Sequence, residues 1–195
     1  MKALKLFVLL FVLETLKANP IVQDITESDE SDESAEIDEE DEFTWRLSGK
    51  IYPISYEIEL ETKVHDEGNR NYSGNVIIHL GVREPTKQII LHSKGLEIDE
   101  VFLFNGITTV DEIMFFYIES LDLFVIETLN NFLPGNDLML LLEFKGQLQL
   151  EGVGFYRSEY KINGETRFLA TTQFEASHAR NAFPVFDGEI NQSVG

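Results

Sequence analysis

The residues best placed to bind a ligand lie near the C-terminal end of the sequence, in the stretch RFLATTQFEASHARNAFPVFD from Arg167 to Asp187. Gln173 and Glu175 are two residues apart at the end of an expected strand. Their side chains should therefore project to one side, and that of Phe174 to the other. The pair is expected to be presented together, although polar residues on one face of a strand are usually only its solvated face.

No motif for metal-assisted or nucleophilic chemistry accompanies this pair. The 195 residues contain no His-Glu-x-x-His, no Gly-x-Ser-x-Gly, no phosphate-binding Gly-rich loop and no cysteine. Four scattered histidines have no partner at a metal-ligand spacing, and we expect structural roles for them: His65, His79, His92 and His178. The sequence predicts neither a metal nor another cofactor in this chain, and no hydrolytic activity for the chain as given.

The composition limits the classes of partner. Fifteen basic residues stand against 35 acidic ones, a net charge of -20, which argues against nucleic acid and anionic membrane surfaces. Residues 24–42 hold 12 acidic residues and no basic ones, and such a segment cannot bury enough apolar area to offset its ordering entropy. We predict a disordered acidic segment over residues 19–42 and a folded domain over residues 43–195.

The N-terminal residues are typical of a secretory signal peptide. Met1, Lys2 and Lys5 form a short basic region, an apolar run extends from Leu6 to Leu13, and Ala18 offers a small residue for cleavage. We predict a signal peptide over residues 1–18 and a secreted, extracellular product; an amphipathic or buried helix is the alternative. The run is too short to span a bilayer, which takes about 20 residues.

From residue 51 onward the sequence predicts short strands. Ile54, Tyr56, Ile58 and Leu60 alternate with polar residues, which places them on one apolar face. A second alternating set runs from Tyr72 to Val82. Further apolar runs bounded by turn residues are expected to be strands: 88–92, 96–104, 113–118, 123–127 and 137–144.

Asn163-Gly164 predicts a tight hairpin between strands at 155–161 and 166–175. Several short strands at such spacing indicate an all-β fold, an antiparallel sandwich or a saddle-like sheet.

Several stretches together resemble the amino-terminal domain of the zinc aminopeptidases of the aminopeptidase N type. They follow the family's order: IYPISYEIEL (its Leu-Pro-x-x-Tyr-x-Leu pattern, here with Tyr52-Pro53), YSGNVIIHL, LHSKGLEI, GFYRSEY and the Gln-x-Glu…Ala-Arg-x-Ala-Phe-Pro stretch. The resemblance extends from Arg46 to Asp187. Beyond Pro184 the family's Cys-Phe-Asp-Glu-Pro is replaced by Val-Phe-Asp-Gly-Glu.

The resemblance implies that Glu175 helps to bind the free α-ammonium group of a peptide substrate and that Gln173 lines the pocket for its first side chain. A charge-assisted hydrogen bond suits such a cation. The family's zinc and its second amine-binding carboxylate, in a Gly-x-Met-Glu-Asn strand, belong to a catalytic domain whose motifs this chain lacks.

Two hypotheses of function follow. The first is a secreted, non-catalytic relative that binds peptides or another protein at most; the alternative is part of a complete zinc aminopeptidase that removes N-terminal residues. We expect the partner, a peptide N-terminus or another protein, to contact the face from Gln173 to Phe186. There Phe174, Phe183 and Phe186 would form an exposed apolar patch that favours self-association. Two sequons, at Asn71 and Asn191, are expected glycosylation sites.

Overall fold

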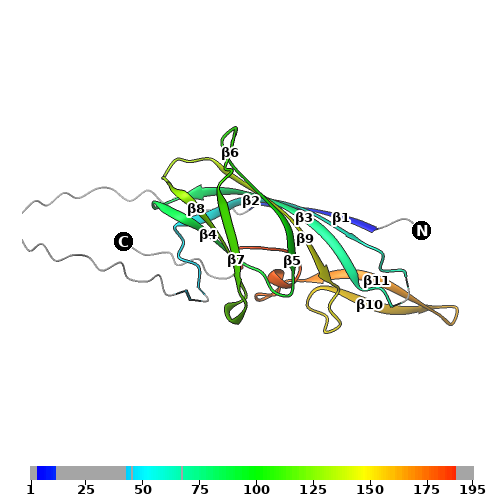
Figure 1. Ribbon diagram of the computed structural model, residues 1–195. Coiled ribbons are helices and arrows are strands. Elements are labelled where there is room, and N and C mark those ends of the chain that lie inside the picture. The colour runs from blue at the N-terminus through cyan, green and yellow to red at the C-terminus, as the bar shows by residue number, and fades with distance from the viewer. Residues whose placement is uncertain (1–3, 12–42, 45, 67, 188–195) are drawn as a thin grey trace, which may run out of the picture.

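The computed structural model describes residues 4–11, 43–44, 46–66 and 68–187, with backbone alone for residues 4–11. The described residues are almost entirely β-strand (Figure 1). The elements are β1 (Leu4–Phe11), β2 (Ile51–Thr62), β3 (Asn71–Val82), β4 (Thr86–His92), β5 (Glu97–Asn105), β6 (Thr108–Thr109), β7 (Ile113–Ile118), β8 (Leu123–Phe132), β9 (Leu138–Gln147), β10 (Gly154–Ile162) and β11 (Glu165–Gln173), with short 3-10 helices η1 (Glu119–Leu121) and η2 (Ala179–Asn181).

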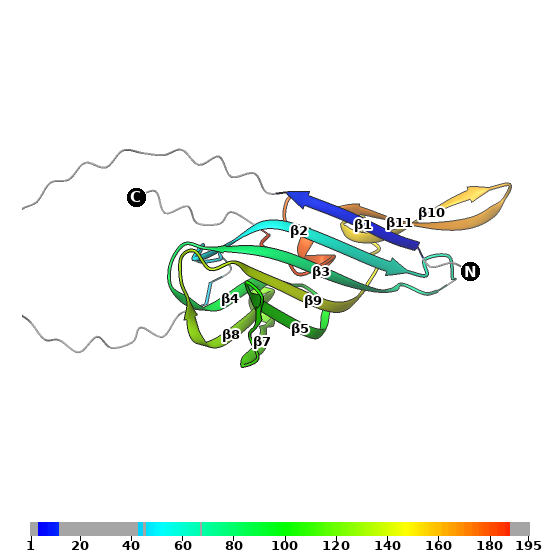
Figure 2. The ribbon, with the colours of Figure 1, turned by 90° about the horizontal axis from the view of Figure 1, so that it is seen from above.

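The strands form three antiparallel sheets. The largest has the order β1-β2-β3-β9-β5-β6, a second has the order β4-β8-β7, and β10 pairs with β11 alone. Figure 2 shows the β4-β8-β7 sheet below the long strands of the first sheet. This architecture confirms the predicted all-β antiparallel fold.

One core joins the two larger sheets. In the first sheet Ile58 lies opposite Val76, and Val76 opposite Leu142; each is at most 1% exposed. Ile89 and Phe124 of the second sheet belong to the same buried cluster. Burying a side chain of this size stabilises a fold by roughly 1.5–3 kcal/mol, so the alternating apolar residues of β2, β3 and β9 fix which face of the sheet is inside.

The predicted inward position of Ile54 is wrong. Tyr56, Ile58 and Leu60 are buried as expected, but Ile54 is 46% exposed. The β2–β3 register shifts between Pro53 and Ser55, and a β-bulge of this kind adds a residue and reverses the alternation. Before the bulge the odd-numbered residues of β2 face the core, and after it the even-numbered ones do. Ile51 is accordingly buried.

The other predicted strands are all present, with ends moved by a few residues. The predicted hairpin is β10–β11, and its turn uses positive φ angles of 50° at Asn163 and 85° at Gly164. Such angles are tolerated by asparagine and glycine. The hairpin extends beyond the two larger sheets (Figure 2).

The N-terminal region is described only in part. Leu4–Phe11 forms β1, which pairs antiparallel with β2, so the expected alternative of a helix is wrong for these residues. Cleavage of residues 1–18 stays a prediction. The acidic segment 19–42 and the sequon at Asn191 lie outside the described residues, and in the described part of the chain no helix is long and apolar enough to cross a membrane.

Candidate functional site

Gln173 and Glu175 lie at the end of β11, where the hairpin meets the rest of the domain. Gln173 is the last residue of β11, opposite Gly154 of β10. The Glu175 backbone N–H donates a hydrogen bond to Gln173 Oε1 at 3.3 Å, and both residues are exposed. The Glu175–Ala176 peptide bond is cis. Glu175 lies in the turn that follows β11, outside the strand on which the predicted alternation depends. The projection of the two side chains to one side and their role in binding stay predictions.

Phe174 projects toward the interior instead. Its ring packs edge to face against Phe183, with centroids 5.6 Å apart, and Phe174 is half-buried against the core. Within the described part of the chain, the Glu175 carboxylate has no hydrogen bond or ion pair. The result is a carboxylate that faces solvent on a backbone anchored by a neighbouring aromatic ring.

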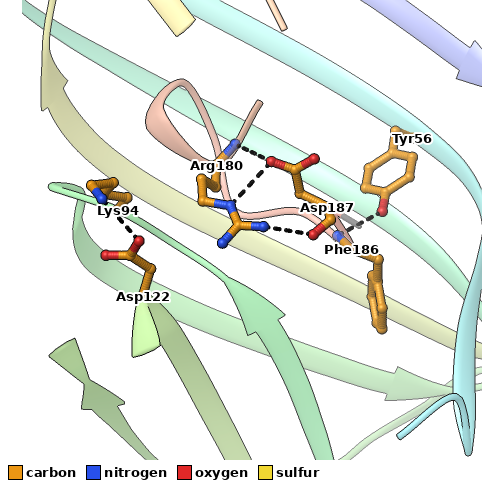
Figure 3. Close-up of polar contacts among 6 residues, drawn as sticks. All are labelled: Tyr56, Lys94, Asp122, Arg180, Phe186 and Asp187. Carbon is orange, nitrogen blue, oxygen red and sulfur yellow. Dashed lines mark hydrogen bonds and ion pairs between the residues drawn. The ribbon is translucent and has the colours of Figure 1, made fainter. Parts of the chain in front are cut away.

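The segment after Glu175 is fastened to the first sheet by two tyrosines. The Tyr72 hydroxyl donates a hydrogen bond to the Ala182 carbonyl at 2.9 Å, and the Tyr56 hydroxyl accepts one from the Phe186 N–H at 3.1 Å (Figure 3). Tyr56 is 4% exposed and Tyr72 3%. Burial raises the pKa of both phenols well above their usual range, and the nearby charge of Asp187 raises that of Tyr56 further, while the Phe186 hydrogen bond lowers it.

The same segment is closed on itself by Arg180 and Asp187. Arg180 donates from its backbone N–H and from Nε to Asp187 Oδ2, both at 3.2 Å, and from Nη2 to the Asp187 carbonyl at 2.8 Å (Figure 3). The two side chains are only 14% and 9% exposed. A buried guanidinium needs such a partner, because an unpaired charge is strongly destabilising there.

The segment also reaches the second sheet. His92, at the end of β4, exchanges two backbone hydrogen bonds with Val185, of 2.8 and 3.0 Å. His92 is buried, His79 and His178 are half-buried and His65 is exposed. No group of three or more His, Asp or Glu side chains that could hold a metal ion occurs among the described residues, so the zinc of the family finds no ligands in this part of the chain.

The expected exposed patch of phenylalanines is wrong. Phe183 is 2% exposed and packs against Tyr56, with ring centroids 6.3 Å apart, and Phe174 and Phe186 are partly buried against the core. The most exposed run of large apolar residues lies instead on β7: Met114, Phe115, Phe116 and Tyr117, which are 38–63% exposed.

The anchoring residues were not identified from the sequence. Alternation places Tyr56 and Tyr72 inside, but their hydrogen-bond partners lie 130 and 110 residues away in the chain. Arg180 and Asp187 are only seven residues apart, yet no periodic pattern pairs them, because they lie in irregular backbone.

We predict that the domain loses stability as the pH rises above about 10, the ordinary pKa of tyrosine. The folded state keeps the protons of Tyr56 and Tyr72 that the unfolded chain releases, so unfolding is increasingly favoured with rising pH. Urea unfolding measured between pH 8 and 11 should show this decline, and Tyr72→Phe should make it shallower. An equally steep decline in Tyr72→Phe would contradict the assignment to Tyr72.

We further predict that Asp187→Ala lowers the free energy of unfolding by about 3–5 kcal/mol, because it leaves the Arg180 guanidinium buried without its partner. Lys94→Ala is the matched control: Lys94 forms an ion pair with Asp122 at 3.0 Å (Figure 3), but its side chain is 52% exposed. Loss of such a surface pair costs about 0–1 kcal/mol. Equal effects of the two substitutions in urea unfolding would refute a structural role for the buried pair.

Comparison with known proteins gives a consistent assignment. The model of the peptidase M1 N-terminal domain matches residues 52–190. Thyrotropin-releasing hormone-degrading ectoenzyme from Homo sapiens is 32% identical over 155 residues, Aminopeptidase M1-C from Oryza sativa subsp. japonica 33% over 143, and Aminopeptidase A from Gloydius brevicauda 35% over 146. These alignments cover 73–76% of this chain but only 14–16% of each relative. The chain belongs to the M1 aminopeptidase family, of which it carries the N-terminal domain.

Proposed function

We propose that this domain binds the free N-terminus of peptides through Glu175, with Gln173 beside the first side chain, and that the 195-residue chain does not hydrolyse them. The observation that carries the proposal is that the Glu175 carboxylate is exposed and forms no hydrogen bond or ion pair with a described residue. The backbone N–H of Glu175 donates a hydrogen bond to Gln173 Oε1. A carboxylate in this state is free to accept hydrogen bonds from an ammonium group.

The expected binding is weak. A solvent-exposed ion pair contributes about 0.2–1 kcal/mol, because water competes for both charges. Hydrolysis would in addition require a metal ion that polarises the carbonyl group and activates water. Neither the motif for such a site in the sequence nor a cluster of ligands among the described residues supports it.

We predict that a short peptide amide with a free N-terminus shifts the backbone NMR signals of residues 173–176, and that the same peptide with an acetylated N-terminus does not. Glu175→Gln should weaken binding about two- to fivefold, as expected for loss of one exposed charge pair. The control is Glu159→Gln, which removes an exposed carboxylate from β10 of the same hairpin. Equal shifts with the acetylated peptide would contradict recognition of the ammonium group.

A second candidate is that the domain belongs to a complete zinc-dependent aminopeptidase. The observation that favours it is the length of the relatives, because the matched part of this chain covers only 14–16% of each of them. In that case a further domain would supply the zinc, and Glu175 would line the border of a shared active site.

The intact mass of the natural product separates the two candidates. Captured with an antibody against residues 24–42 and treated with N-glycosidase, a stand-alone product should have close to the mass of residues 19–195 and should not release amino acids from aminoacyl nitroanilides. A several-fold heavier, active species would establish the second candidate, and Glu175→Gln should then raise its KM.

We also propose that the product is extracellular and carries a glycan at Asn71. Asn71 is the first residue of β3 and is exposed, and the human relative is named an ectoenzyme. Loss of an N-glycosidase-sensitive mass shift in Asn71→Gln would identify the modified residue.

A further inference from the structure

Strand β2 has two different neighbours along its length. Ser55–Thr62 is paired with β3 on one side and, in antiparallel register, with β1 on the other. Figure 2 shows β1 lying along this outer edge of the sheet. The pairing stops short of Pro53 and the β-bulge that follows it, two features that protect sheet edges from further strands. The rest of the edge has neither feature.

Cleavage of the predicted signal peptide would remove β1 from the protein. Residues 4–11 lie within residues 1–18, so cleavage would leave the backbone groups of Ser55–Thr62 that face β1 without partners. An open edge of this length binds extended polypeptide segments readily.

The edge is selective in its chemistry. An incoming strand must place apolar residues opposite Tyr56, Ile58 and Leu60, which are at most 4% exposed and lie on the core face. On the other face it meets a row of carboxylates formed by Glu57, Glu59 and Glu61. A basic residue there is favoured, and an acidic one is disfavoured.

A second copy of the chain does not meet these requirements. An antiparallel pairing of two β2 strands over most of Ser55–Thr62, with their apolar residues on the core face, sets glutamates of one strand against those of the other. Like charges opposite one another are destabilising, and each chain already has a net charge of -20.

Residues 4–11 meet the apolar requirement and place one basic residue on the acidic face, where Phe7 and Leu9 lie opposite Glu59 and Glu57. Their sequence, LKLFVLLF, contains no acidic residue, and the register sets Lys5 opposite Glu61, Leu6 opposite Leu60 and Val8 opposite Ile58. We propose that, once the leader is removed, the Ser55–Thr62 edge is a strand-acceptor site for an extended apolar segment of another protein with a basic residue opposite Glu61. This site is separate from Gln173 and Glu175 and does not depend on the function proposed for them.

The test uses the protein secreted by cells that express the complete chain, with its N-terminus determined by intact mass. The probe is a fluorescent octapeptide with the sequence of residues 4–11 and a neutral solubilising tail. Binding should be saturable in fluorescence anisotropy, and amide exchange should slow about tenfold or more at alternate residues of 55–62, where new hydrogen bonds form.

Two N-methylated peptides are the matched controls, because only alternate amides of a bound strand point toward its neighbour. One peptide is methylated on the amides of residues 5, 7, 9 and 11, the other on those of 6, 8 and 10. One set should bind about tenfold or more weakly and the other nearly as well as the unmodified peptide. Equal binding of both sets would show apolar adsorption and overturn the proposal.

A charge exchange tests the register. The substitution Glu61→Lys in the protein should lower its affinity for the unmodified probe about two- to fivefold. A version of the probe with Lys5→Glu should restore binding to that variant. Absence of this reciprocity would overturn the register. A secreted chain that retains residues 4–11 would overturn the proposal itself, because the edge would then be filled by its own chain.

Discussion

The attachment of segment 174–187 to both larger sheets is the constraint on which the rest of the structure depends. Two buried tyrosine hydroxyls hold it on the first sheet, through Ala182 and Phe186, and the His92–Val185 hydrogen bonds hold it on the second. Phe183 of this segment belongs to the buried core and packs against Tyr56. These contacts join residues more than 90 positions apart in the chain, so they form only when both sheets are in place, and the conformation after Glu175 depends on the complete core.

This attachment explains why an exposed residue has a defined position. Glu175 follows a half-buried phenylalanine and precedes a segment closed by the buried Arg180–Asp187 pair. The backbone on either side is therefore held by interior contacts, while the carboxylate itself remains in water. Binding at Glu175 therefore requires little further ordering of the backbone, although the side chain itself still loses rotamer freedom.

Much of this fold follows from local patterns in the sequence. Alternation identifies β2 and β3, and Asn163-Gly164 identifies the β10–β11 hairpin, because these signals lie between neighbouring residues. The errors have non-local causes. A bulge beside Pro53 turns Ile54 outward, and Phe183 is buried because Tyr56 and Tyr72 draw its segment onto the sheet. Spacing alone singles out Gln173 and Glu175, whose role stays a prediction, whereas no local pattern identifies the residues that hold their segment in place.

The geometry of Glu175 also limits what the domain can do unaided. An ammonium group bound by one hydrated carboxylate gains little, because the Coulomb energy of a pair in water is about 1 kcal/mol at 4 Å. Strong and selective binding requires a second surface that excludes water and adds further acceptors. Phe183 does not contribute to such a surface, because it is buried in the core. In the function proposed above, the Gln173–Glu175 edge therefore supplies one part of a recognition site, and the affinity of that site depends on the surface that meets it.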